Sequence, residues 1–127
     1  MNVHLLSEAV GQISLMTDTR LRQTGFLLGD VIGKHALIQS LFPQPFNRRT
    51  IAALYDRFYR QYGHRLRGVF FCHTAPFSHE WFRDDVILSI SGRGIHAYSY
   101  QSEGPKMTKK HHRLEGIRRN HDGINGR

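Results

Sequence analysis

Two adjacent residues, Cys72 and His73, are the first place where residue types suggest catalysis. A thiol beside an imidazole can form a nucleophile and its base, provided that the two side chains meet. The pair ends an apolar, aromatic run over residues 66–72 that predicts an interior strand. Since adjacent residues of a strand point to opposite faces, His73 cannot serve Cys72 as a base. We therefore expect Cys72 to be a buried structural cysteine.

Three large aromatic residues, Phe77, Trp81 and Phe82, gather between Pro76 and Arg83. Packed inward, they would be ordinary core. Exposed, they would form a surface for a protein partner or for self-association, because aromatic anchors dominate interface energetics.

Basic residues are the unusual feature of the composition: 18 Lys and Arg face 10 Asp and Glu, which gives a net charge of +8 and a pI near 10.3. From Gly104 onward there are seven Lys and Arg and two acidic residues. A nucleic acid could be attracted through counterion release by Arg48, Arg49, Arg57 and Arg60 and by Lys109 and Lys110 of the basic tail. The alternative interpretation is a solvated terminus that promotes solubility.

The length of 127 residues suits one compact core and excludes a multidomain enzyme. A single cysteine excludes an intrachain disulfide and a Cys-rich zinc site, and fits a reducing compartment. The apolar runs are far shorter than the roughly 20 residues of a membrane helix, and the N-terminus lacks the pattern of a signal peptide. We expect a cytoplasmic protein with no membrane association.

The predicted elements alternate between helices and hairpins. They are a helix over residues 3–16, a hairpin of residues 24–32 and 34–41 that turns at Gly33, a helix that begins after Asn47 and ends at Gly63, a strand over residues 66–72, a loop or short helix over residues 74–83, and a second hairpin of residues 86–91 and 95–100. We expect one domain over residues 1–102 and a basic, flexible tail over residues 103–127.

This order of elements, together with three short motifs, resembles the JAB/MPN domains, the fold of the JAMM metalloproteases. The motifs are a Gly-apolar-Leu-apolar-Gly hairpin start (residues 25–29), a Phe-Pro-x-Pro exit (residues 42–45) and a strand end at His73 (residues 68–73). The resemblance covers roughly residues 3–101 and implies an α/β fold: a mixed β-sheet sandwich of the three-layer, cytidine-deaminase-like type, with helices on both faces.

The resemblance also implies a site for zinc, but most of its residues are replaced. His73 stands at the second histidine position and Asp84 at the expected third ligand, whereas Phe71 replaces the first histidine and Arg22 replaces the catalytic glutamate. We therefore expect a catalytically inactive domain without a cofactor. It would act as a protein-binding or scaffolding module, with a protein partner or as a homodimer.

Two alternatives remain open. The first is a rewired zinc peptidase or isopeptidase, in which His79 or His64 joins His73 and Asp84 as a metal ligand and Glu80 acts as the base. The second is a nucleic-acid-binding module that acts through the basic tail.

Overall fold

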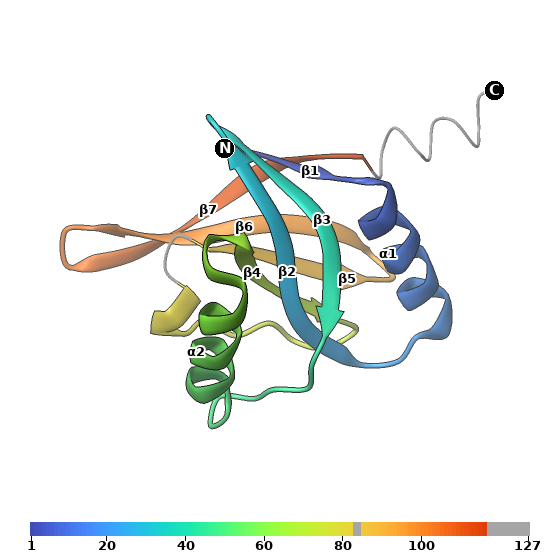
Figure 1. The fold of residues 1–127 in the computed structure, drawn as a ribbon, viewed down its shortest axis with the longest axis horizontal. Coiled ribbons are helices and arrows are strands. Elements are labelled where there is room, and N and C mark those ends of the chain that lie inside the picture. Colours follow the sequence, from blue (N-terminus) through green and yellow to red (C-terminus); the bar gives the residue numbers. More distant parts are fainter. Residues whose placement is uncertain (83–84, 117–127) are drawn as a thin grey trace.

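The computed structural model describes residues 1–82 and 85–116. Over these residues seven strands close into a barrel and two α-helices pack against it (Figure 1). The elements are β1 (Asn2–Leu5), α1 (Ser7–Thr19), β2 (Gln23–Ile32), β3 (His35–Pro43), α2 (Ile51–Tyr62), the 3-10 helix η1 (Gly63–Arg65), β4 (Leu66–Cys72), the 3-10 helix η2 (Glu80–Phe82), β5 (Val86–Ser91), β6 (Gly94–Glu103) and β7 (Lys106–Glu115).

The barrel runs in the order β1-β3-β2-β4-β5-β6-β7. Strand β1 closes it, because it pairs in parallel with β3 on one side and with β7 on the other. Strands β4 and β5 also pair in parallel, and the remaining neighbours are antiparallel. The sheet is therefore mixed, and its closure depends on the shortest strand.

Two cores bury the two faces of the sheet. The α1 core joins buried residues of α1, such as Ile13, to aliphatic residues from strands around the barrel. The α2 core is aromatic and lies between α2 and strands β2, β4, β5 and β6. Neighbouring residues of β4 divide between them, since Phe70 belongs to the α1 core and Phe71 to the α2 core. This division explains the continuous apolar run, because a strand buried on both faces loses the alternation of polar and apolar residues.

Helix α2 confirms the prediction made from its apolar stripe. Ile51 and Phe58 are buried in the α2 core, and Gly63 ends the helix with a φ of 57°. Asn47 caps the preceding turn, where its Oδ1 accepts hydrogen bonds from the backbone N–H groups of Arg49 (2.8 Å) and Thr50 (3.1 Å). Both predicted hairpins and strand β4 are likewise present at the expected positions.

The predicted fold class was wrong. The chain forms a closed seven-stranded barrel with two α-helices over the described residues, not a three-layer α/β sandwich with helices on both faces. The difference comes from the two strands that close the barrel. Residues assigned to the start of a long helix form β1, and residues assigned to a flexible tail form β7. Strand β7 consists largely of charged and polar residues and so lacks the apolar alternation that indicates a strand.

Neither helix of the described residues combines the length and the apolar character needed to cross a membrane.

Candidate nucleic-acid interface

Strands β6 and β7 continue beyond the barrel as a two-stranded ribbon (Figure 1). Strand β5 pairs with β6 only as far as Tyr98, and β1 pairs with β7 only from Arg113 onward. Between these limits, residues 99–103 of β6 pair with residues 106–110 of β7, and His111 and His112 pair with Tyr98 and Ala97. None of residues 99–112 pairs with a further strand of the described chain. We call residues 99–112 the ribbon.

The ribbon holds three of the four lysines of the chain, Lys106, Lys109 and Lys110, and all three are exposed. Because side chains alternate along a strand, Lys106 and Lys110 share one face of the ribbon and Lys109 occupies the other. The ribbon therefore presents cations on both of its faces.

The base of the ribbon is anchored on each face. On the α2 side, the Lys109 ammonium lies 4.2 Å from the centre of the Tyr98 ring, within the range of a cation–π contact. Burial, and to a lesser extent the nearby Tyr100, raises the pKa of Tyr98 to about 12, so its hydroxyl is neutral at physiological pH.

On the opposite face, the Ser99 hydroxyl and His112 Nε2 lie 2.7 Å apart and share a hydrogen bond. Burial lowers the pKa of His112, with smaller contributions from the Met1 amino group, Lys110 and His111. His112 Nδ1 is buried and has no hydrogen-bond partner among residues 1–82 and 85–116. The imidazole is therefore held neutral at the point where the ribbon joins the barrel.

The arginines predicted to bind nucleic acid on α2 and just before it are partly engaged within the fold. Arg48 donates to the Ser78 carbonyl (3.3 Å) and lies 4.7 Å from the centre of the Phe77 ring. Arg60 pairs with Asp56 at 3.1 Å. Arg49 and Arg57 are exposed.

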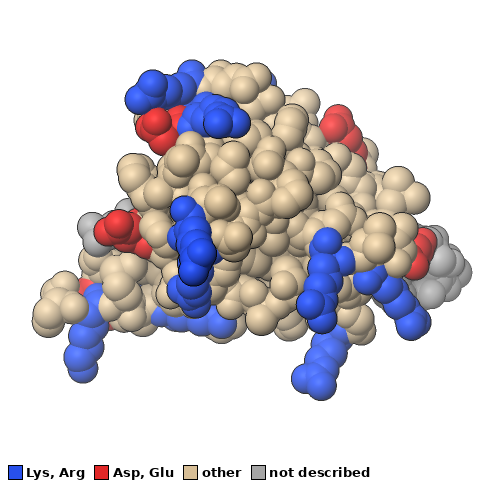
Figure 2. Space-filling view, turned by 90° about the horizontal axis from the view of Figure 1, so that it is seen from below, with Lys and Arg blue, Asp and Glu red and all other residues tan. Residues whose placement is uncertain are grey.

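Figure 2 shows the side of the molecule that faces downward in Figure 1, and the Lys and Arg side chains drawn there stand apart between areas of uncharged surface. A continuous positive surface is therefore not formed on that side by the described residues. The ribbon is the better candidate, because three lysines lie close together along β7, although Glu103 of β6 is opposite one of them, Lys106.

Three of the predicted metal ligands, His64, His73 and His79, lie in the described part of the chain. Within the described part of the chain, no three His, Cys, Asp or Glu side chains are grouped so that they could hold a metal ion. His73 follows β4 with a φ of 54°, and its Nε2 is buried without a hydrogen-bond partner in the same part of the chain. His79 Nδ1 accepts instead from the Trp81 backbone N–H (3.3 Å). The proposed base Glu80 begins η2 and His64 lies in η1, whereas Asp84 lies outside the described residues.

The predicted aromatic surface divides between core and exterior. Phe82 is fully buried, Phe77 is half-buried against the α2 core, and Trp81 is 42% exposed. The Trp81 ring lies 5.9 Å from that of Tyr55. Cys72 is buried, as its position in the strand predicts, and burial raises the pKa of its thiol.

Two polar contacts have no counterpart in the predictions. The Tyr55 hydroxyl donates a short hydrogen bond to the Asp85 carboxylate, and burial followed by the charge of Asp85 raises the pKa of Tyr55. At the barrel closure, His4 of β1 shares a hydrogen bond with His35 of β3 (2.8 Å) and lies 3.4 Å from Glu115 of β7. These side chains therefore connect the three strands. Neither contact could be found from the sequence, because the partners lie at least 30 residues apart.

Comparisons with known proteins support the fold only. No family model matches the sequence, and no curated protein matches it. Among solved structures, the solution structure of protein DSY2949 from Desulfitobacterium hafniense is similar, with a TM-score of 0.52 over 89% of this chain and 92% of that one, at 17% identity. The predicted membership of the JAB/MPN family, and with it the JAMM-like character, was wrong, since the sheet closes into a barrel over the described residues.

Proposed function

We propose that this chain is a binding module whose ribbon contacts the phosphate backbone of double-stranded nucleic acid. The observation that carries the proposal is the ribbon itself, in which the ends of two barrel strands extend beyond the barrel and carry lysines on both faces.

The two-sided arrangement favours a groove over a flat partner. The major groove of B-DNA accommodates a two-stranded β-ribbon and has phosphates along both of its edges. A ribbon within it can direct Lys109 toward one edge and Lys106 and Lys110 toward the other. A flat protein surface would contact only one face of the ribbon.

Duplex is favoured over single-stranded nucleic acid because the ribbon offers few rings for base stacking. The Tyr98 ring is buried and covered by Lys109, and Tyr100 is half-buried. Single-strand binding usually depends on exposed aromatic side chains. Phosphate contacts carry little sequence information, so we expect weak sequence preference.

The test is fluorescence anisotropy with a labelled random-sequence duplex of about 20 base pairs, at salt concentrations from about 50 to 200 mM. Replacing Lys106, Lys109 and Lys110 together by Gln should lower affinity at least ~10-fold and reduce the salt slope by about 0.9 for each phosphate that is no longer neutralised. Lys34→Gln is the matched control, since Lys34 is the remaining lysine and lies exposed at the β2–β3 turn. Equal affinity of the triple variant and the control would overturn the proposal.

A second candidate function is protein binding, including self-association, at the surface around Trp81. The exposure of this large side chain beside Tyr55 favours it. Sedimentation velocity over a range of concentrations should show association that Trp81→Ala abolishes. A wild-type chain that stays monomeric at all concentrations would reject the homodimer.

A cytoplasmic location accompanies both proposals. It is supported by the single cysteine, which is buried and free.

A further inference from the structure

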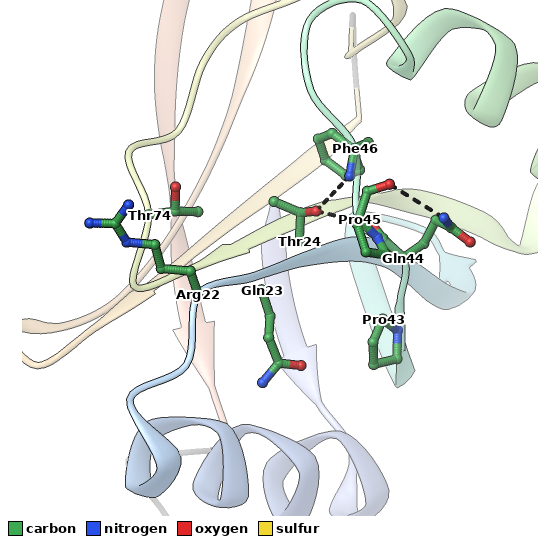
Figure 3. A pocket seen from close by; sticks show the side chains of 8 residues that line it. All are labelled: Arg22, Gln23, Thr24, Pro43, Gln44, Pro45, Phe46 and Thr74. Carbon is green, nitrogen blue, oxygen red and sulfur yellow. Dashed lines mark hydrogen bonds between the residues drawn. The ribbon is translucent and has the colours of Figure 1, made fainter.

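An open pocket of about 200 Å³ lies where β2 begins and where β3 and β4 end. We call it the Arg22 pocket. Its lining comes from the start of β2, the connection from β3 to α2, and the segment after β4 (Figure 3): Arg22, Gln23, Thr24, Pro43, Gln44, Pro45, Phe46 and Thr74.

One side of the pocket is fixed before any ligand arrives. The Thr24 hydroxyl donates to the Gln44 carbonyl (3.0 Å) and accepts from the Phe46 N–H (3.0 Å), while the Gln44 N–H donates to the Thr24 carbonyl (2.9 Å). Pro43 and Pro45 restrict the backbone further. This surface is therefore preorganised, and ligand binding costs little free energy for ordering it.

The polar groups of the pocket suit a carboxylate better than a phosphate. Among the described residues that line the pocket, Arg22 alone is charged, and amides and hydroxyls supply the other polar groups. The N–H groups of Gln44 and Phe46 are already bonded to Thr24, and prolines have none, so this side lacks the free backbone donors of a phosphate cradle. The planar guanidinium of Arg22 can pair with a carboxylate through two parallel hydrogen bonds.

The rest of the lining is apolar and rigidly backed. The Phe46 ring packs edge-on against Phe71 (5.5 Å) and Phe77 (5.9 Å) in the α2 core. Together with Pro43 and Pro45 it forms a surface that suits an aliphatic or aromatic group.

The β4 side of the pocket has strained backbone. His73, which directly precedes Thr74, adopts a left-handed conformation (φ 54°), and its Nε2 is buried without a partner among the described residues. Non-glycine residues in this conformation cluster at ligand sites, where the surrounding structure maintains the strain.

We propose that the Arg22 pocket binds a small monocarboxylate with an apolar body. The carboxylate pairs with Arg22 near the Thr74 hydroxyl, and the apolar body lies against Phe46 and the two prolines. The Arg22 pocket shares no residue with the ribbon, so the test of carboxylate binding is independent of nucleic-acid binding.

The experiment is a titration of phenylacetate into ¹⁵N-labelled protein, followed through backbone amide shifts. We expect shifts at Thr24, Gln44, Phe46 and Thr74, and an affinity at least tenfold lower in Arg22→Gln. Arg20→Gln is the matched control, because Arg20 is an exposed arginine two residues away and outside the lining. Unchanged amide shifts elsewhere in unliganded Arg22→Gln would show that the fold is intact.

Two further probes test the ligand class. Phenylacetamide has nearly the same shape without the charge, and phenyl phosphate replaces the carboxylate by a phosphate. We expect both to bind more weakly than phenylacetate. Equal binding of phenylacetamide, tighter binding of phenyl phosphate, or the absence of shifts with millimolar phenylacetate would each overturn the proposal.

Discussion

Strands β6 and β7 belong to two different environments along their length. Near the barrel they carry buried side chains, among them Ala97 and Tyr98, and they pair with β5 and β1. In the ribbon the same two strands pair only with each other and carry exposed lysines. Backbone pairing alone therefore does not create a core. Substitutions in the barrel should change stability, whereas substitutions in the ribbon should change binding.

The largest expected difference between the two regions comes from removing apolar side chains. Phe70→Ala empties a fully buried position of the α1 core and should lower the free energy of unfolding by about 3–5 kcal/mol. Met107→Ala in the ribbon, where the side chain is 46% exposed, should change it by less than about 0.5 kcal/mol. Urea denaturation measures both. A similar decrease in the free energy of unfolding for the two variants would show that the ribbon packs against the barrel in solution.

The next largest effect on stability is expected where strands β4 and β5 approach each other closely. A Cβ on Gly68 would lie 1.8 Å from the Val86 carbonyl oxygen, so Gly68→Ala must separate β4 from β5. We expect a loss of at least about 1–3 kcal/mol, as for other overpacked sites. Gly92→Ala is the control, because nothing lies within 4 Å of the added carbon. Thermal unfolding should separate the two variants, and an unchanged Tm for Gly68→Ala would contradict the close approach.

A smaller effect is expected where α2 is connected to the start of β5. Tyr55→Phe removes the hydroxyl that donates to Asp85 and leaves the ring, which packs against the α2 core. The expected loss is about 1–3 kcal/mol, because a hydrogen bond to a charged acceptor contributes more than a neutral one. Tyr59→Phe, on the exposed side of the same helix, should have almost no effect in the same denaturation experiment.

The smallest expected effect on stability arises at His112, where the ribbon joins the barrel. Because burial lowers the pKa of His112, the folded state keeps the imidazole neutral while the unfolded chain binds a proton near pH 6.5. Stability should fall as the pH drops below about 6.5, and this contribution should level off once the pH passes below the folded pKa. The dependence should be weaker in His112→Gln and should persist in Ser99→Ala, which retains the imidazole. Parallel pH dependences in His112→Gln and the unmodified chain would contradict this.

Strong local signals determined much of the fold from the sequence alone. The stripe that includes Ile51 and Phe58 predicted α2, the hairpin turn at Gly33 was correctly placed, and the apolar run through Phe70 predicted a strand buried on both faces. Each of these signals lies within a few residues of chain, so a period of 3.6 or 2 and a turn residue suffice to read it.

The closure of the barrel was decided by tertiary structure. Val3 of β1 is apolar at a spacing that also suits a helix, and only its pairing with β3 and β7 makes that segment a strand. Strand β7 has almost no apolar residues, and antiparallel pairing with β6 holds it in place. The partners of β1 lie far away in the sequence, so its pairing leaves no local pattern. Strand β7 instead forms a hairpin with β6, and its polar residues lack the apolar alternation that indicates a strand.

The candidate sites, too, depend partly on the sequence and partly on the tertiary structure. The sequence placed Lys109 and Lys110 in a basic segment, but it could not show that Lys109 lies over Tyr98 or that Lys106 faces the other side. Arg22 and Thr74 likewise meet in one pocket only because β2 begins beside the end of β4. Residue types determined which charges the chain carries, and the register of the strands decided which surface each one occupies, because alternation assigns a face only once a partner strand is fixed.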